Sequence, residues 1–396
     1  MEITIKNLKQ IIQSANVNFL YGSGLSRNYL ETLGNIEKLL TEAGKHLELS
    51  KKQRDIIKTS LYAEYFNGVM RRCLPSIIDE DKEKFNKTFN EYVCFLNTLN
   101  VIMSRRSVNL INKQINLFTT NIDDFTEKAL EFTKVEFNDG FKGRINPIFS
   151  EDSFSNVIFK SSVLYQNNST IPVFNLLKIH GSINWKSNDG KDVTYDPNLS
   201  MISKVSEELD KIDKPYLIEI KEDSQFDSLV KKARKIKVPD GLYDNFLDDY
   251  SKLVMINPTK AKFSETVLDY HFYELMRMYS NSLEKSSSVL FVAGFSFADE
   301  HIANITMRAA NANPTLQIIV FAYNDNAKQG IEGVLNKKGL SNNNVEIISP
   351  EDYKAAIKKS LAKKEGIVIK DLDNLEHFDF ASLNKYVFKV LSSVVI

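Results

Sequence analysis

A histidine and an asparagine stand at the ends of two apolar segments and could do chemistry. His180 ends the run 173–181 and is followed directly by Gly181, while Asn121 lies in the stretch TTNIDD that ends the run 115–123. Histidine titrates near neutral pH and can act as a general base. An asparagine amide donates and accepts hydrogen bonds, so it can orient a water molecule. Each residue also has a structural interpretation, as a packed histidine at a strand edge and as a helix-capping asparagine.

Two further polar segments each follow an apolar run. The turn YGSGLS at 21–26 has two glycines, which let a backbone come close to a phosphate, and the N-terminus of a following helix would favour the negative charge. A G-x-G turn is also common as a plain tight turn. The segment AGFSFADEHI at 293–302 contains Gly294 and Ser296, which could face a ribose or a phosphate. Its acidic residues could equally form the first turn of a helix.

Short apolar runs along the chain predict buried strands. They lie at 17–22, 115–123, 173–181, 252–257, 288–296 and 316–323, with a weaker seventh at 345–349. Continuous apolar runs of this length are typical of a parallel sheet that is covered on both faces, and helical patterns lie between them. We therefore expect an α/β protein with a Rossmann-like parallel sheet flanked by helices. The four polar segments would then share the carboxyl ends of the strands, where open α/β sheets bind ligands.

Long stretches between the strands predict insertions. Residues 28–106 have a helical pattern after the first strand, and residues 187–249 are more polar and are expected to be irregular, as in a flap. We expect a main domain over 1–330 and a mostly helical C-terminal extension over 331–396. An apolar stripe in that extension consists of Phe380, Leu383, Val387 and Leu391. The stripe could contact either the sheet or another chain.

Composition excludes several functional classes. The 51 basic and 51 acidic residues cancel, which gives no electrostatic footprint for nucleic-acid binding. Cys73 and Cys94 are the only cysteines and cannot form a four-thiolate zinc site, so we expect no metal. The N-terminus lacks the apolar core of a signal peptide, and no run approaches the roughly 20 residues that span a bilayer. We expect a cytoplasmic protein without a membrane or sequence-specific nucleic-acid partner.

The four motifs, in this order, resemble the sirtuin superfamily. Sirtuins open with a G-A-G-x-S turn, here GSGLS, and continue with T-Q-N-I-D, here TTNID, and a histidine-glycine pair, here HGS. A later I-N step is matched by Ile256 and Asn257. The resemblance covers roughly residues 15–26, 115–185 and 250–325. It implies a sirtuin-like fold and NAD binding.

Two departures point to a particular branch of that superfamily. Sirtuin deacylases have an aspartate-phenylalanine-arginine step after the glycine turn and a four-cysteine zinc module, whereas this chain has RNYLETLG and two cysteines. The helical insertion and the GFSFADEHI segment instead look like the sirtuin-like NAD hydrolases of bacterial anti-phage defence. In that family the asparagine and histidine of these motifs carry the reaction, which implies Asn121 and His180 here. Such relatives often form large rings, and some work beside a HerA-type ATPase, so the resemblance implies a homo-oligomer and such a partner.

Hydrolysis of the nicotinamide bond suits an asparagine and a histidine. The pyridinium leaving group departs without a proton, so the site does not need the acid of a two-carboxylate glycosidase. His180 would activate water, Asn121 would place it, and Gly181 would leave room for the sugar. The resemblance implies further contacts to NAD: Gly22, Ser23, Gly24 and Ser26 at the pyrophosphate, Asp123 at the carboxamide, Asn257, Gly294 and Ser296 along the adenosine side, and Thr120, Asp299 and His301 to complete the set.

Three functions are therefore open. The first is an NAD glycohydrolase that depletes NAD on infection, with NAD as substrate. The second is an NAD-dependent protein deacylase, against which the missing zinc module argues. The third is a non-catalytic subunit that binds NAD or ADP-ribose, against which the intact pair of Asn121 and His180 argues.

Overall fold

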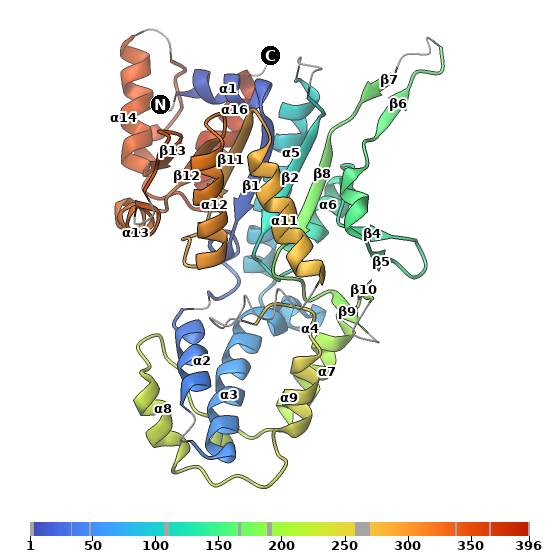
Figure 1. Cartoon of the computed structure of the whole chain (residues 1–396), viewed down its shortest axis with the longest axis vertical. Helices are drawn as coiled ribbons and strands as arrows, with labels where there is room; N and C mark the ends of the chain where they lie inside the picture. Colours follow the sequence, from blue (N-terminus) through green and yellow to red (C-terminus); the bar gives the residue numbers. More distant parts are fainter. Residues whose placement is uncertain are drawn as a thin grey trace.

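The structure, a computed structural model, describes residues 4–32, 34–46, 49–106, 111–164, 168–187, 192–257, 270–336, 339–363 and 366–394. A seven-stranded sheet forms its centre, with the order β13-β12-β11-β1-β2-β8-β3 (Figure 1). Every pair of neighbouring strands in this sheet is parallel. The chain therefore has the predicted α/β class, with a Rossmann-like parallel sheet flanked by helices.

The strands coincide with most of the apolar runs. Their bounds are β1 Asn16–Tyr21, β2 Gln114–Thr119, β3 Phe137–Asn138, β8 Val173–Lys178, β11 Ser288–Ala293, β12 Gln317–Phe321 and β13 Val345–Ile348. The expected strand at 252–257 is wrong, because this segment lies across the end of β8 and forms only an isolated bridge between Gly181 and Met255. The edge strand β3 completes the sheet instead, and two residues are too few to give a recognisable apolar run.

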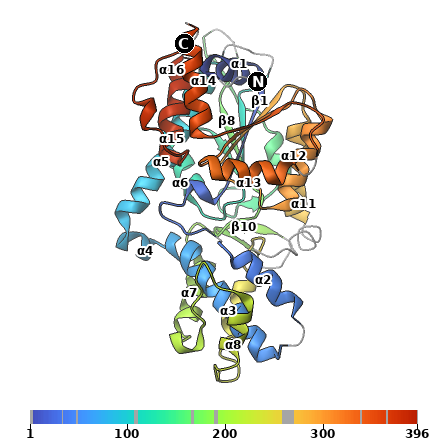
Figure 2. The ribbon, with the colours of Figure 1, turned by 90° about the vertical axis from the view of Figure 1, so that its left-hand side faces the viewer.

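Helices cover both faces of the sheet (Figure 2). One layer consists of α1 Ile5–Ser14, α5 Lys82–Ser104, α6 Phe125–Thr133, α14 Pro350–Ala362, α15 Phe380–Leu383 and α16 Lys389–Val394. The other consists of α11 Tyr270–Glu284, α12 Glu300–Ala312 and α13 Asp325–Asn336. Within β1, Phe19 packs into the first layer and Leu20 into the second. The alternation of side chains along a strand thus supplies both apolar cores.

The segment 331–396 is part of the sheet unit rather than a separate extension. It supplies the edge strand β13, which pairs with β12. The apolar stripe of Phe380, Leu383, Val387 and Leu391 is buried in the first helical layer. Next to the stripe, the ring centroid of Phe388 lies 5.8 Å from that of Phe19 in β1. The stripe therefore contacts its own sheet and is not an exposed surface for another chain.

The two insertions combine into one helical lobe at the carboxyl end of the sheet (Figures 1 and 2). The first supplies α2 Ile36–Lys45, α3 Lys51–Tyr65 and α4 Pro75–Glu80, and the second supplies α7 Ser200–Asp210, α8 Phe226–Ala233 and α9 Asp244–Ser251. The rings of Tyr62 and Tyr250 stack across the two insertions at 4.2 Å. The backbone N–H of Ile218 donates to Ser60 Oγ at 2.9 Å. Residues 192–249 are thus not irregular, since three short helices bury apolar faces in the lobe, α8 and α9 against α3 and α7 against α9.

Smaller elements lie beside β8. A four-stranded sheet consists of β4 Phe141–Lys142, β5 Ile148–Phe149, β10 Val193–Tyr195 and β9 Trp185–Ser187, and β6 Phe159–Ser161 pairs with β7 Asn168–Thr170 in a hairpin. A 3-10 helix, Glu151–Ser155, follows β5. In the described part of the chain, no helix has both the length and the apolar character that a membrane crossing needs.

Candidate functional site

The predicted motifs meet at the carboxyl ends of four adjacent strands. The backbone N–H of Thr120 donates to Tyr21 O at 3.4 Å, and that of Ile179 donates to Thr119 O at 2.9 Å, so the ends of β1, β2 and β8 are level. Strand order reverses at β1, because the chain continues to β2 and β8 on one side and returns as β11 on the other. Open α/β sheets bind ligands at such a reversal. The half-buried Thr120 lies beside it.

His180 faces a carboxylate that the helix α12 holds in place. Its Nε2 atom lies 3.0 Å from Asp299 Oδ2, with side-chain exposures of 10% and 6%. The other carboxylate oxygen, Oδ1, accepts from the backbone N–H groups of His301 at 3.0 Å and Ile302 at 3.3 Å. Asp299 is therefore the N-cap of α12 and the partner of His180 at once. His301 contributes its backbone N–H to the cap.

Asn121 presents a buried amide to this region. Its Nδ2 atom lies near the Tyr92 hydroxyl, yet it has no hydrogen-bond partner among the described residues. Asn257 Oδ1 is likewise buried, and its hydrogen-bonding capacity is unused in the described part of the chain. Unpaired buried amides are unfavourable and therefore uncommon in folded proteins. The capping interpretation fails for Asn121, and the N-cap position of α6 belongs to Asp124. Asp123 Oδ1 accepts from the backbone N–H of Phe125, the first residue of that helix, at 3.2 Å.

Asp123 and Ser26 bind each other inside the protein. Ser26 Oγ donates to Asp123 Oδ2 at 3.1 Å and lies 2.8 Å from the Tyr92 hydroxyl. Burial raises the pKa of the Asp123 carboxyl to about 6, and the Lys178 ammonium opposes the rise. The expected contacts of Ser26 with a pyrophosphate and of Asp123 with a carboxamide are replaced by these internal bonds, because both side chains are buried.

The glycines of the first turn pack against the turn after β11. A Cβ atom on Gly24 would lie 2.7 Å from Gly294 Cα, and one on Gly22 would lie 2.9 Å from Gly294 O. Gly294 itself has a φ of +59°, which favours glycine. Close approach of two backbones therefore explains these glycines without a ligand. Exposed hydrogen-bonding groups in the two turns come from Ser23 and Ser296.

The helix expected directly after β1 is absent. A 3-10 helix of three residues, Ser23–Leu25, follows β1, and the next α-helix is α2 in the lobe. A single short turn aligns too few peptide dipoles to hold an anion as a full helix does. The helices α6 and α12 both begin in this region, and Asp299 caps α12.

Gly181 is required by packing rather than by a ligand. Its φ is +76°, and the place of a Cβ atom is filled by Val254 O, at 2.3 Å. The backbone N–H of Ile256 donates to His180 O at 2.9 Å. The expectation that Gly181 leaves room for a sugar is therefore wrong, because the misassigned segment 252–257 occupies that space and holds the backbone of His180.

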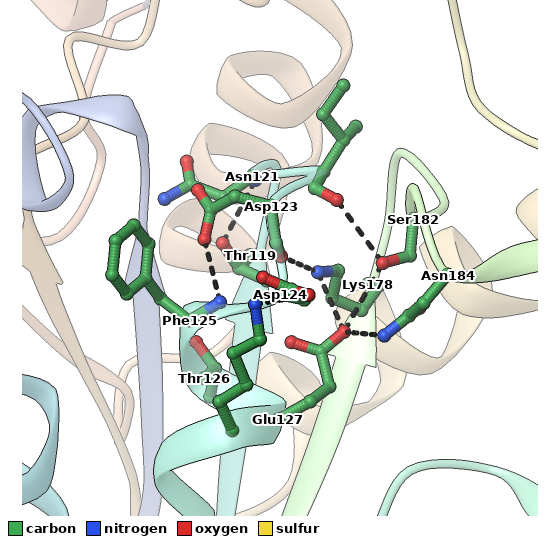
Figure 3. A network of polar contacts seen from close by, with 12 residues as sticks. Thr119, Asn121, Asp123, Asp124, Phe125, Thr126, Glu127, Lys178, Ser182 and Asn184 are labelled. Atoms are coloured by element: carbon green, nitrogen blue, oxygen red, sulfur yellow. Dashed lines mark hydrogen bonds and ion pairs between the residues drawn. The ribbon is translucent and has the colours of Figure 1, made fainter. Parts of the chain in front are cut away.

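A buried ion pair that the sequence analysis missed fixes the neighbouring loop (Figure 3). Lys178 Nζ lies 2.9 Å from Glu127 Oε1, with side-chain exposures of 2% and 6%. The same carboxylate oxygen accepts from Ser182 Oγ at 3.2 Å and Asn184 Nδ2 at 3.3 Å. Lys178 Nζ also donates to the carbonyl oxygen of Asp123. A lysine inside the apolar run NLLKIHG is the sequence signal, since a buried charge needs a partner.

The chain matches no protein-family model and no curated protein sequence. Over the described residues, no group of three or more histidine, cysteine, aspartate or glutamate side chains could hold a metal ion. The chemical capacity of the strand ends lies in a histidine at ion-pair distance from a carboxylate and in a buried amide, Asn121, whose Nδ2 has no hydrogen-bond partner among the described residues. Such a set can accept a proton from water and orient a polar substrate group.

Proposed function

We propose that this chain hydrolyses NAD at its nicotinamide bond and releases nicotinamide and ADP-ribose, as a sirtuin-like NAD hydrolase of anti-phage defence. The contact of His180 with Asp299 carries the proposal, together with the buried Asn121 amide, which also lies at the carboxyl end of a parallel strand. A carboxylate next to a histidine can orient the ring. The motif resemblance supplies the substrate.

In this proposal His180 is the base and Asp299 positions it. Asp299 Oδ2 lies 3.0 Å from Nε2, although Nε2 is not in hydrogen-bond geometry in the structure. In the proposal a small rotation of the ring completes this hydrogen bond, which leaves Nδ1 to accept a proton from water. The water oxygen bonds to C1′ of the ribose, and the C1′–N bond breaks with its electron pair moving to the pyridinium ring. Nicotinamide leaves neutral, so no group has to protonate it. Asn121 Nδ2 donates to the water or to a ribose hydroxyl.

The proposed contacts with the rest of NAD differ from those expected from the sequence. Ser23 and Ser296 are exposed beside the reversal of strand order and are the groups available to the pyrophosphate and adenosine. Gly22, Gly24 and Gly294 shape the two turns, and their role toward NAD is indirect. Cytoplasmic location, homo-oligomeric assembly and a HerA-type ATPase partner accompany the proposal from the resemblance, and the buried C-terminal stripe does not serve that assembly.

Release of nicotinamide from NAD by the purified full chain tests the proposal. His180→Ala should lower the rate by about a hundred- to ten-thousand-fold, the usual contribution of a general base. His271→Ala is the matched control, because His271 also pairs with a carboxylate, Glu151, but lies outside the four motifs. The proposal fails if His180→Ala retains the wild-type rate, or if folded wild-type protein releases no nicotinamide in the presence of phage components. An acetyl-lysine peptide in the same assay tests for deacylation.

A further inference from the structure

A buried tyrosine on α5 lies beneath the candidate site. Tyr92 is 1% exposed. Its ring stacks on that of Phe125, the first residue of α6, with centroids 5.5 Å apart, and meets the ring of Phe380 in α15 edge-on at 4.8 Å. Close packing between these helices fixes the ring, and the place of its hydroxyl is fixed with it. Tyr92 belongs to none of the four motifs, so the resemblance to sirtuins assigns it no role.

The Tyr92 hydroxyl lies beside groups from two of the motifs. Its oxygen is 2.8 Å from Ser26 Oγ, in the turn after β1. Ser26 Oγ donates in turn to Asp123 Oδ2 at 3.1 Å, in the loop after β2. The amide of Asn121, in the same loop, lies next to the Tyr92 hydroxyl. One hydroxyl from α5 therefore stands between the turn after β1 and the loop that holds Asn121.

The direction of these hydrogen bonds follows from what each group can donate. At neutral pH the Asp123 carboxylate can only accept, so the one hydrogen of Ser26 Oγ is used toward it. Ser26 Oγ must then accept the hydrogen of Tyr92. Burial raises the pKa of the Tyr92 phenol well above its ordinary value, and the charge of Asp123 raises it further, so the hydroxyl keeps the hydrogen that it donates. The Tyr92 oxygen is left as an acceptor.

This acceptor matches the unused donor of Asn121. Nδ2 of that amide is buried without a hydrogen-bond partner among the described residues, and such a donor is costly to leave unpaired. Oδ1 of the same amide is not enclosed in this way. A rotation of the amide that brings Nδ2 into hydrogen-bond geometry with the Tyr92 oxygen satisfies the buried donor. It leaves Oδ1 and the second hydrogen of Nδ2 for a substrate.

We infer that Tyr92 is a positioning residue, which orients the Asn121 amide by accepting a hydrogen bond from Nδ2 while Ser26 and Asp123 fix the direction of the Tyr92 hydroxyl. Its effect on catalysis rests on the proposed function, in which Asn121 meets the water or the ribose. Without the hydroxyl, nothing at this position distinguishes the nitrogen of the amide from its oxygen. A flipped amide presents an acceptor where the reaction needs a donor.

Kinetics of nicotinamide release by the full chain test this inference. Tyr92→Phe removes the hydroxyl and keeps the ring, so kcat should fall about tenfold to a hundredfold while KM for NAD changes little, because a misplaced reacting group slows the chemical step. Tyr279→Phe is the matched control, since the buried Tyr279 hydroxyl lies 2.8 Å from Thr306 Oγ1 on the other face of the sheet. Both variants should lower the urea midpoint by similar amounts, and Tyr279→Phe should keep the wild-type kcat.

Ser26→Ala keeps the test decisive if Tyr92→Phe fails to fold. This variant removes the acceptor of the Tyr92 hydroxyl and should lower kcat, but less than Tyr92→Phe does. In the double variant, Ser26→Ala should add nothing to the loss, because Ser26 acts on Asn121 only through Tyr92. The inference is overturned if either single variant keeps the wild-type kcat, if Tyr279→Phe lowers kcat equally, or if the losses multiply in the double variant.

A second readout does not depend on catalysis. In protein labelled with ¹⁵N at asparagine, the side-chain resonance of Asn121 is the one that is missing from Asn121→Ala. It should shift in Tyr92→Phe and stay in place in Tyr279→Phe. If the wild type releases no nicotinamide but this resonance shifts, the proposed function fails and the contact between Tyr92 and Asn121 stands. A resonance that does not move in Tyr92→Phe overturns the contact.

Discussion

Two histidine–carboxylate pairs lie in different surroundings in this chain. His180 ends a strand, and its partner Asp299 is fixed by the first turn of α12. His271 lies on α11, and its partner Glu151 lies in a short 3-10 helix that packs against α11. In the motifs around His180, Asn121 Nδ2 and Asn257 Oδ1 have no hydrogen-bond partner among the described residues, whereas the His271 ring contacts the Phe149 ring at 5.6 Å. The same two functional groups become a candidate reaction centre only where rigid elements hold them and neighbouring polar groups are left free for a substrate.

The largest effect on NAD hydrolysis, beside that of His180→Ala, is expected at Asn121. Asn121→Ala should lower NAD hydrolysis by about a hundred- to ten-thousand-fold, comparable to His180→Ala, because both act on one step. The double variant should be little worse than either single variant, since residues that work as a unit are non-additive. Rates of nicotinamide release from the three purified variants check this. Multiplicative losses in the double variant would show that the two residues act separately.

The buried ion pair of Lys178 and Glu127 tests how burial determines what an ion pair contributes to the free energy of unfolding. Lys178→Met leaves Glu127 buried without a cation and should lower the free energy of unfolding by about 3–5 kcal/mol. The exposed pair of Lys142 and Asp152 is the control. Lys142→Met should change the free energy of unfolding by about 0–1 kcal/mol. Urea denaturation measures both. Equal effects of the two substitutions would contradict the assignment of Lys178 as a structural anchor of the site loop.

The role of the Asp299 carboxylate toward His180 can be separated from its role as the N-cap of α12. Asp299→Asn keeps a good N-cap residue, so stability should change little. Nicotinamide release should fall on the order of a hundredfold, less than the roughly ten-thousand-fold loss for the corresponding change in serine protease triads. The pH profile of the remaining activity should shift, which a purely structural role would not cause. Glu151→Gln, the same change at the other pair, should leave rate and profile unaltered.

Asp123 gives the smallest expected effect. Burial raises the pKa of its carboxyl to about 6 from 3.8, so the folded protein binds this proton more tightly than the unfolded chain. Its contribution to stability therefore falls as pH rises from 3.8 to about 6, by about 1–3 kcal/mol in total. Asp123→Asn should remove the Asp123 part of the pH dependence of the free energy of unfolding. Asp139, whose pKa is also raised to about 6 by burial, should still contribute to that pH dependence. Identical slopes for wild type and Asp123→Asn in unfolding experiments would exclude this effect.

The sheet was predictable because its strands are buried on both faces. Continuous apolar runs such as 288–296 and 316–323 are typical of strands that are buried on both faces. The run 252–257 was wrongly predicted as a strand because a buried segment that crosses the end of a strand is equally apolar. Leu253, Met255 and Ile256 are all buried. The helices α7, α8 and α9 were missed because each is short and bears a charged outer face.

The candidate site was predictable only in part. The sequence places Asn121 and His180 at strand ends, since each motif follows an apolar run. It cannot reveal that Asp299 faces His180, because the contact joins loops of different strands. Nor does it distinguish a glycine that admits a phosphate from one that admits another backbone, as at Gly24 and Gly294. The buried pair of Lys178, by contrast, could have been predicted from the sequence, because a lysine within an apolar run indicates a buried partner of opposite charge.

The lobe built from the two insertions has a mechanical consequence. The chain passes from the sheet to the lobe through the turn 22–26, and again through 180–184, and it leaves α9 through 253–257. Each of these connections contains a motif of the candidate site. Three of the lobe's connections to the sheet are therefore loops of the candidate site, and the fourth, between α4 and α5, lies outside it. A rotation of the lobe would strain the loop that holds His180 opposite Asp299, which is anchored on the sheet side by α12.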